Sequence, residues 1–301
     1  MSGIIGGLIS IVKNCRMLCN PPVIVNRRYP RMGQGASAGK LDRRQKRMIP
    51  KTIHYCWFGG AKMSNLAERC IASWRRVMPD WDIREWSEDN FDIGQNRYAK
   101  EAYEQRKWAF VSDYARLKIL YEHGGVYMDI DVEALKPLDA FLVHGAFSGF
   151  EDDRYISPVI IGAQRGNGWI RDLLDDYDNR LFVLPGGELD ITTNVITVTE
   201  KSKALHGFVP NGEYQVLAHD VHIYPTEWFC PLSCEYGIMR MTEDSHTIHY
   251  WNASWLPPRR RLIAKTRRWI RKNLGETVWG IVRKTAESVG IGPTGRTMRR
   301  R

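Results

Sequence analysis

Two aspartates, Asp129 and Asp131, close the apolar stretch in the segment HGGVYMDIDV. Side chains two apart on a β-strand point to the same face of a sheet, so a strand end would present both carboxylates together. Neighbouring carboxylates repel and raise each other's pKa unless a cation lies between them, and Mg²⁺ and Mn²⁺ prefer oxygen ligands of this kind. The pair therefore predicts a divalent metal that holds a diphosphate, and a surface turn is the alternative for an isolated D-x-D triplet.

A third metal ligand is expected near the end of the apolar body, in the segment SHTIHYW. Neutral imidazole is a suitable ligand for Mn²⁺ and would complete a site that two aspartates leave open. We choose His249 for this role. His246 is the rival ligand, and an ordinary structural histidine is the alternative for either.

Signals for strands and helices alternate through residues 48–257, which is the arrangement needed to position these groups. The pattern predicts a helix that begins after Ser64 and stops at Pro79, and a long helical segment that Gly124 closes. Strands are expected at residues 48–60, 81–86, 126–132, 146–150, 157–163, 221–225 and 246–251, and further helices at 167–182 and 193–205. This alternation predicts an α/β domain with a largely parallel sheet, in which ligands gather at the carboxyl ends of the strands.

Charge is distributed unevenly along the 301 residues. Residues 1–47 contain 10 basic residues and 1 acidic residue, residues 48–257 contain 20 and 31, and residues 258–301 contain 14 and 2. An acidic body argues against a nucleic-acid cleft, whereas the basic ends favour contact with an anionic surface. We therefore predict three parts, which are a loosely ordered leader (1–47), a folded domain (48–257) and a basic amphipathic helical tail (258–301).

The tail has the pattern of a helix that lies on a membrane surface. Apolar residues recur at helical spacing through LIAKTRRWIRKNLGETVWGIVRK, with tryptophans among them and Arg and Lys between them. Such a helix suits an anionic membrane, and packing against the acidic body is the alternative. The apolar run GIIGGLISIV is about half the length of a membrane span and lacks the flanks of a signal peptide. These features predict a cytoplasmic protein that is peripheral at the inner face of the membrane.

Four blocks together resemble the DXD sugar transferases of glycosyltransferase family 32, which include capsular polysaccharide enzymes and yeast Golgi mannosyltransferases, with glucosylating clostridial toxins as distant relatives. The blocks are IPKTIHYCWFGG, FVSDYARLKILYEHGGVYMDIDVEALKPLD, FSGFED and HYWNASW, within residues 49–255. The resemblance implies a GT-A-type fold and a retaining, metal-dependent transfer of sugar from a nucleotide-sugar donor, such as a UDP- or GDP-sugar.

The resemblance also implies roles for the residues of the second block. Asp113 and Arg116 would contact hydroxyl groups of the donor sugar, and an ordinary helix salt bridge is the alternative for this pair. Asp129 would contact the ribose and the metal, and Asp131 would bind the metal directly. His249 corresponds to the C-terminal ligand that closes over the metal diphosphate in related sugar transferases.

Further residues would surround the nucleotide. By resemblance Trp57 would stack on the base, with His54 as a weaker candidate that is otherwise a buried polar residue of its strand. Gly125 would let the nucleotide approach the backbone, and its alternative is a turn after the helix. Ser254 and Trp255 resemble the serine and tryptophan of the family's closing loop. Asp152 and Asp153 would face the acceptor or lie in a solvated loop.

The acceptor is less defined than the donor. A lipid-linked or capsular glycan is our first expectation, a protein acceptor is the second, and a non-enzymatic membrane-binding module is the third. No nucleic-acid partner is expected. The six cysteines do not show the spacing of a zinc site, so we expect reduced thiols.

Overall fold

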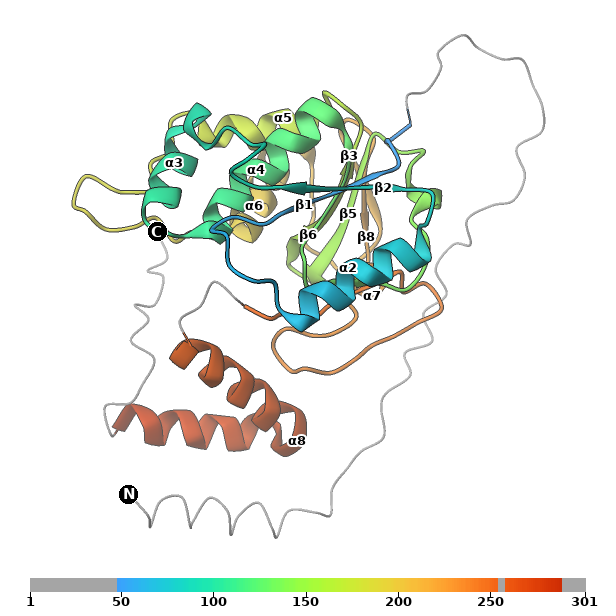
Figure 1. Cartoon of the computed structure of the whole chain (residues 1–301). Helices are drawn as coiled ribbons and strands as arrows, with labels where there is room; N and C mark the ends of the chain where they lie inside the picture. The colour runs from blue at the N-terminus through green and yellow to red at the C-terminus, as the bar shows by residue number, and fades with distance from the viewer. Residues whose placement is uncertain (1–47, 254–257, 289–301) are drawn as a thin grey trace. The chain divides into compact units, whose positions relative to one another are not determined.

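The computed structural model describes residues 48–253 and 258–288 (Figure 1). The predicted leader, residues 1–47, lies outside the described residues. The chain divides into a body, which extends to Lys272, and a second unit that contains residues 273–288.

A seven-stranded sheet forms the centre of the body, in the order β2-β1-β3-β6-β5-β8-β7. Strands β2, β1, β3, β5 and β8 share one direction, and β6 and β7 run in the opposite direction. The predicted α/β fold with a mostly parallel sheet is therefore confirmed. The strands are β1 (Thr52–Cys56), β2 (Asp82–Trp86), β3 (Gly125–Met128), β5 (Ala146–Asp152), β6 (Tyr155–Ala163), β7 (Gln215–Leu217) and β8 (Val221–Tyr224). A second small sheet pairs β4 (Val132–Ala134) with β9 (Thr247–His249).

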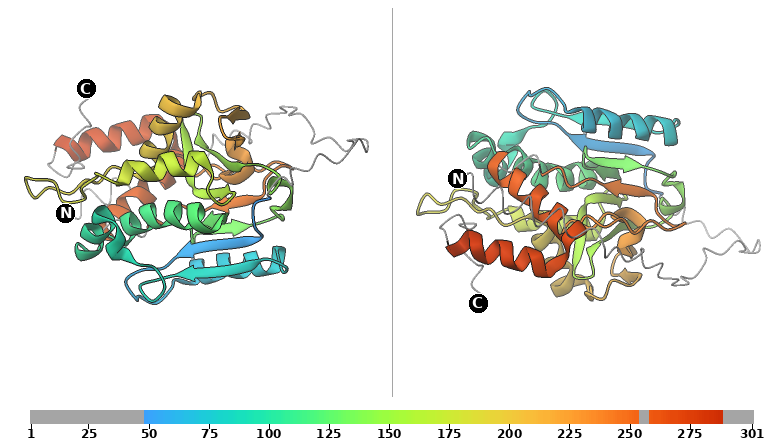
Figure 2. Two further views of the ribbon diagram at one scale, coloured as in Figure 1. Left: turned by 90° about the horizontal axis from the view of Figure 1, so that it is seen from above. Right: turned by 90° about the horizontal axis from the view of Figure 1, so that it is seen from below.

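Helices cover both faces of the large sheet. Figure 2 shows α2 on one side of β1 and α4 on the other. Alternate strand residues enter the two cores, since Tyr127 belongs to the core that contains Leu120 of α4, while Met128 belongs to the core that contains Trp74 of α2. The helices are α2 (Asn65–Val77), α3 (Arg97–Glu104), α4 (Trp108–His123), α5 (Gly168–Leu174), α6 (Asn194–His206), α7 (Thr226–Phe229) and α8 (Pro258–Ser288), with 3₁₀ turns at Ile93–Gln95, Asp139–Phe141 and Asp175–Tyr177.

The predicted helix boundaries are partly correct. Ser64 caps α2, where its Oγ accepts a hydrogen bond from Ala67 N. The long helical segment before Gly124 is two helices, because the chain turns at Arg106, whose φ of 55° is left-handed. The helix expected over 167–182 ends its α-helical part at Leu174 and continues as a 3₁₀ turn.

Helix α8 contains a break at Gly275, where φ is 81° and ψ is 172°. Glycine allows this left-handed φ without steric cost, so the basic tail forms two helical segments rather than one. None of the helices in the described part of the chain combines the length and apolar character needed to cross a bilayer.

Strand β3 ends one residue before the aspartates. Asp129 N still bonds to Val159 O of β6 at 2.9 Å, and then Val132 N bonds back to Asp129 O at 3.0 Å. The prediction that both aspartates extend from a strand is therefore wrong, because Asp129 and Asp131 stand on a turn between β3 and β4. This turn still brings the two carboxylates together.

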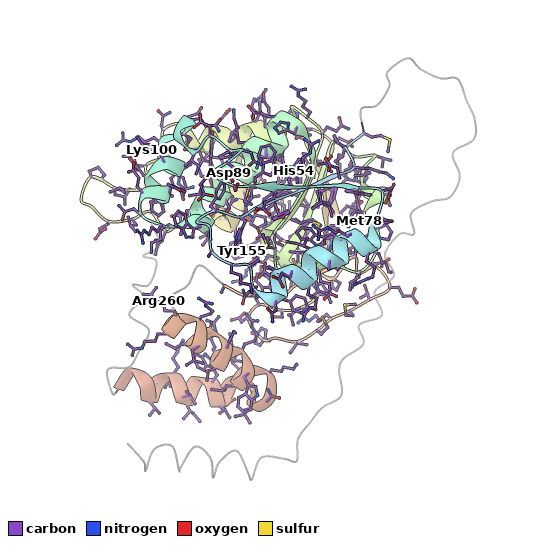
Figure 3. All side chains as sticks on the ribbon, viewed as in Figure 1. His54, Met78, Asp89, Lys100, Tyr155 and Arg260 are labelled. Carbon is purple, nitrogen blue, oxygen red and sulfur yellow. The ribbon has the colours of Figure 1, made fainter. Side chains whose placement is uncertain are left out.

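His54 lies inside the body and supports the turn after α4 (Figure 3). Its Nδ1 accepts a hydrogen bond from Trp86 Nε1 at 3.1 Å, and its Nε2 bonds to Gly124 O at 2.9 Å. A Cβ atom on Gly125 would stand 2.8 Å from His54 Nε2 and 2.8 Å from Thr52 O. Gly125 is therefore needed for packing at the start of β3.

We expect stability to fall in acid because of His54. Burial lowers its pKa from 6.5 to about 4, so between these values the unfolded chain binds more protons than the folded protein. The free energy of unfolding should decrease by about 3 kcal/mol as the pH falls through this window. Urea unfolding across this pH range should show that His54→Gln removes this part of the slope. His123→Gln removes an exposed charge that adds a smaller part of the shift, so it should keep most of the slope. Equal slopes for both variants would contradict the prediction.

Candidate active site

Three side chains meet beyond the carboxyl end of β3. One ligand atom from each of Asp129, Asp131 and His249 lies within 4.8 Å of the others. The pairing of β4 with β9 places His249 opposite Val132, directly after the aspartate turn. The distance from His249 Nε2 to Asp131 Oδ1 is 3.3 Å. The structure thus brings together the three residues that the sequence analysis selected as metal ligands.

Asp131 is held from several directions. Its Oδ2 accepts a hydrogen bond from Asn252 N at 2.8 Å, and its backbone oxygen accepts one from Tyr250 N at 3.0 Å. Burial alone would raise the pKa of Asp131, but the charge and hydrogen bond of His249 bring it below its ordinary value. Burial would likewise lower the pKa of His249, whereas the Asp131 carboxylate raises it well above its ordinary value. Without a cation the two groups therefore form a buried ion pair, and a bound metal ion would replace the proton of His249.

Arg116 connects α4 to the same site. Its Nη2 lies 3.0 Å from Asp113 Oδ1 and 3.4 Å from Asp129 Oδ1, and its side chain is 6% exposed. Its Nη1 donates to Pro158 O at 2.9 Å, and its guanidinium lies over the Tyr127 ring. Because the Asp113 side chain is also only 13% exposed, this pair is buried and differs from an exposed helix salt bridge.

The site contains more carboxylate charge than its cations readily balance. Burial raises the pKa of Asp113 to about 6, against the opposing effect of Arg116. Burial also raises the pKa of Asp129, which Arg116 opposes and Asp131 reinforces. A divalent cation would relieve this repulsion, and two carboxylates with an imidazole are donors that Mn²⁺ or Mg²⁺ accepts. The residues present therefore fit the metal that the sequence predicts.

Three neighbouring residues were not identified from the sequence. Tyr127 donates its hydroxyl hydrogen to Asp129 Oδ1 at 2.9 Å, and Asn252 binds Asp131 through its backbone. Glu151, at the end of β5, has a pKa raised to about 7, chiefly by burial. Tyr127 had a usable signal, because it precedes Asp129 by two positions and would share its face in the strand that the sequence predicts. Glu151 precedes two aspartates in the FEDD segment, and nothing in that pattern distinguishes it from a residue of a solvated loop.

Trp57 lies at the same sheet edge as the aspartates, directly after β1. It lines a hollow of about 790 Å³ together with two glycines and two other aromatic residues, and its Nε1 donates to Ala61 O at 2.7 Å. The residues lining the hollow are Trp57, Gly59, Gly60, Glu85, Ser87, Glu88, Asp89, Tyr103, Glu104, Arg106 and Trp108. A stacking role for Trp57 stays a prediction.

Other proposed nucleotide contacts differ from the prediction. His54 is 1% exposed and uses both ring nitrogens within the body, which corresponds to the alternative of a buried polar residue. Gly125 is buried at the amino end of β3, at the opposite edge of the sheet from Asp129, so its backbone is not available to a nucleotide there. Ser254 and Trp255 lie outside the described residues.

The rival ligand and the two acceptor candidates also have clear positions. The His246 ring stacks on Trp228 at 5.6 Å and its Nδ1 bonds to Asp244 O, so the ring points away from the aspartate turn. Asp152 caps the turn between β5 and β6 and pairs with Arg154 at 2.8 Å. Asp153 is exposed on that turn, which agrees with the solvated-loop alternative.

Comparison with known proteins tests the family assignment. Residues 64–148, which include Asp113, Arg116 and both turn aspartates, match the family described as "Glycosyltransferase sugar-binding region containing DXD motif". An uncharacterised glycosyltransferase of Acanthamoeba polyphaga mimivirus is 34% identical over 221 residues, which is 70% of this chain and 85% of the relative. The chain belongs to the DXD-containing glycosyltransferases. Its body has the predicted α/β fold with a mostly parallel sheet, and the protein is a glycosyltransferase enzyme.

The other matches of this glycosyltransferase are shorter or have lower sequence identity. Inositol phosphoceramide mannosyltransferase 1 of Schizosaccharomyces pombe is 33% identical over 113 residues, which is 33% of each chain. This chain therefore spans about one third of that relative's length. Among solved structures, the PaToxG glycosyltransferase aligns with a TM-score of 0.41 and 18% identity over 52% of this chain and 69% of its own. A glycosyltransferase involved in glycosylating the major capsid of PBCV-1 aligns with a TM-score of 0.39 and 10% identity over 71% and 98%.

Proposed function

We propose that this glycosyltransferase transfers a sugar from a nucleotide-sugar donor, in the presence of Mn²⁺ or Mg²⁺ and with retention of configuration, to a lipid-linked glycan at a membrane surface. The observation that carries the donor side is the meeting of Asp129, Asp131 and His249 within 4.8 Å. These three residues would hold the metal. When bound, the cation neutralises charge that develops on the departing diphosphate.

Arg116 would hold the donor-binding carboxylates in position. It holds Asp113 on α4 and Asp129 on the turn at the same time, so the two carboxylates keep a fixed separation. Asn194 Nδ2 also bonds to the backbone oxygen of Asp113 at 3.4 Å, which ties α6 to this position. Asp113 would then accept hydrogen bonds from hydroxyl groups of the donor sugar, where an ionised acceptor makes strong, directional bonds.

Thermal melting tests the donor assignment. The full-length protein is melted with a panel of UDP- and GDP-sugars, with and without Mn²⁺, because ligand binding to the native state raises its stability by about 2.7 kcal/mol at a hundred times Kd. One donor should raise the melting temperature, and only when Mn²⁺ is present. A cooperative melt that no donor shifts under either condition would contradict the proposal.

The membrane-surface acceptor is supported by two observations. The S. pombe relative is named for an acceptor that is a lipid, inositol phosphoceramide. In the first segment of α8, Arg268 Nε donates to Cys234 O at 3.1 Å and Arg271 pairs with Glu235 at 2.6 Å, while Leu262 and Trp269 are more than half exposed. One side of this segment therefore contacts the body, and basic and apolar side chains remain at the surface, as membrane-surface helices require.

Co-sedimentation with vesicles tests this surface. The full-length protein should bind vesicles of mixed phosphatidylcholine and phosphatidylserine. It should dissociate from them at about 1 M salt, where the Debye length falls to about 3 Å and charge attraction is screened. Leu262→Glu should weaken binding because it places a charge on the apolar face. Val143→Glu changes an exposed apolar residue of the body and should have no effect. Equal binding to vesicles of pure phosphatidylcholine would exclude the anionic surface.

A further inference from the structure

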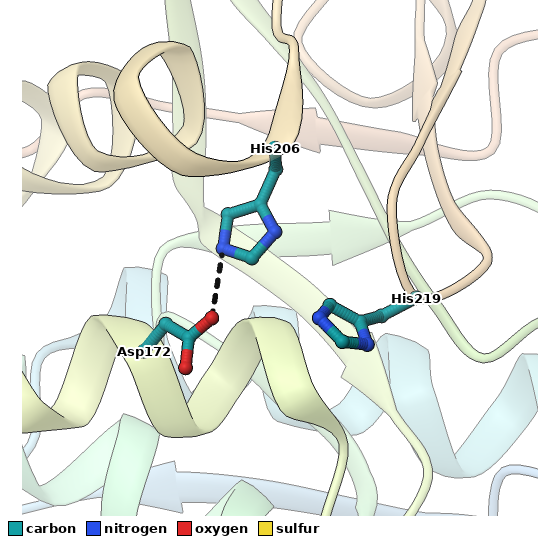
Figure 4. A group of neighbouring side chains, drawn as sticks. All are labelled: Asp172, His206 and His219. Atoms are coloured by element: carbon teal, nitrogen blue, oxygen red, sulfur yellow. Dashed lines mark ion pairs between the residues drawn. The ribbon is translucent and has the colours of Figure 1, made fainter.

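A second group of potential metal ligands lies in the body away from the donor site (Figure 4). Asp172 is on α5, His206 is the last residue of α6, and His219 stands between β7 and β8. One ligand atom of each lies within 4.8 Å of the others. His206 Nε2 is 3.3 Å from Asp172 Oδ2, and the two imidazole rings have centroids 5.5 Å apart.

This group is separate from the aspartate turn. His219 precedes β8, and β8 pairs in parallel with β5 from Val221 opposite Ala146, so His219 lies at the amino edge of these strands. Asp129 follows the carboxyl end of β3, which runs in the same direction. The seven residues of β5 separate the two edges by about 20 Å. A cation at one group therefore cannot be shared with the other.

His206 is the strongest indication that this group binds a ligand. Its side chain is 2% exposed. Its Nε2 faces Asp172 Oδ2 at 3.3 Å without the geometry of a hydrogen bond, and its Nδ1 has no hydrogen-bond partner among the described residues. Buried polar atoms are nearly always satisfied, because leaving one without a partner costs about 1 to 3 kcal/mol. Figure 4 shows the His206 ring directed toward Asp172, with the His219 ring beside them. A bound cation would satisfy the ring nitrogen that faces this space.

The local backbone is shaped to place the third imidazole. His219 adopts a left-handed φ of 62°, which is uncommon for a residue other than glycine. Its ring packs over Gly168 at the start of α5, where a Cβ atom would stand 2.7 Å from the ring. Asn167 Nδ2 also donates to His219 O at 3.4 Å. The turn before β8 is thus attached to α5, and the absence of a side chain at Gly168 makes room for the imidazole.

We propose that Asp172, His206 and His219 bind a divalent transition-metal ion of the Zn²⁺ class that joins α5, α6 and the turn before β8. Two imidazoles and one carboxylate are ligands that Zn²⁺ accepts in tetrahedral sites, with water as the fourth ligand. Hard cations such as Mg²⁺ prefer oxygen donors, so this group would select a different ion from the one at the aspartate turn. The exposed His219 completes the site from the solvent side.

Titration with Zn²⁺ alone, followed by calorimetry, tests this site. Full-length Asp131→Asn protein, in which the donor site is weakened, should bind about one equivalent of Zn²⁺. Adding His219→Asn should weaken Zn²⁺ binding at least about tenfold. Even the loss of a residue that only orients a metal ligand typically lowers metal affinity by about this factor. Asparagine tolerates the left-handed φ at this position, so the variant should fold. Adding His123→Asn instead, at an exposed histidine on α4, should leave the affinity unchanged.

Each other result would overturn the proposal. Failure of the Asp131→Asn protein to bind Zn²⁺, or equal affinity with and without His219→Asn, would show that the group is only a packed polar cluster. Equal weakening by His123→Asn would assign the binding to scattered surface histidines. If Asp131→Asn does not fold, the same comparison in the wild-type background should show one equivalent of Zn²⁺ fewer for His219→Asn, and no such loss would also overturn the proposal.

Discussion

Asp131→Asn should lower kcat/KM for sugar transfer and donor hydrolysis by roughly a thousandfold, because metal stabilisation of a leaving group is worth several kcal/mol and each 1.36 kcal/mol is tenfold in rate. The amide is a weaker ligand than the carboxylate. It also removes the negative charge that pairs with His249 at 3.3 Å. The loss should appear at saturating donor as well as at low donor, since the proposed metal would act on the departing diphosphate.

Steady-state rates at several Mn²⁺ concentrations measure this effect. Asp152→Asn is a matched control, since Asp152 is an aspartate at the end of β5 that pairs with the exposed Arg154. It should retain nearly wild-type kcat/KM. Urea unfolding of both variants establishes that each is folded. A folded Asp131→Asn protein with an unchanged rate and unchanged Mn²⁺ dependence would refute the role of Asp131.

Arg116→Met should reduce the free energy of unfolding by about 3 to 5 kcal/mol, which is the usual cost of removing one partner from a buried ion pair. The change leaves Asp113 and Asp129 buried without their guanidinium and removes the hydrogen bond to Pro158 O. Asp113→Asn should cost clearly less. In that variant Arg116 still pairs with Asp129, and burial already brings the pKa of Asp113 to about 6, so its neutral form is easily reached.

Urea unfolding at neutral pH compares these variants. Arg154→Met is the control for loss of an arginine, since its ion pair with Asp152 is exposed and such pairs are worth about 0 to 1 kcal/mol. The expected order of destabilisation is Arg116→Met first, Asp113→Asn second and Arg154→Met last. If Arg116→Met were as mild as Arg154→Met, the buried network would contribute nothing to stability.

Local sequence patterns predicted part of the candidate site. The D-x-D spacing correctly predicted that the carboxylates of Asp129 and Asp131 lie close together. The expected cause, a shared face of one strand, was wrong. The residues follow one another on a turn that begins after Met128, and hydrogen bonding to Val159 decides where the strand ends. Hydrophobic alternation does not report hydrogen-bond partners, so the strand was extended through both aspartates.

Helix boundaries show the same limit. Apolar spacing continues smoothly from α3 into α4, and only the left-handed backbone at Arg106 separates them. Arginine has no special preference for that conformation, so its identity carries no signal. Ser64 and Pro79, by contrast, act through local chemistry, and the start and end of α2 were predicted correctly from them.

The amino-acid sequence by itself determined the α/β class and the family, because alternating strand and helix patterns and the DXD block are local in the chain. The tertiary structure decided which residues, distant in the sequence, join the two aspartates in the site. The register of β4 against β9 brings His249 rather than His246 to the aspartates, since side chains three apart on an extended chain face opposite ways. Burial likewise turned Asp113 and Arg116 from a simple helix pair into a buried network, because burial depends on elements packed around a residue and not on its neighbours in sequence.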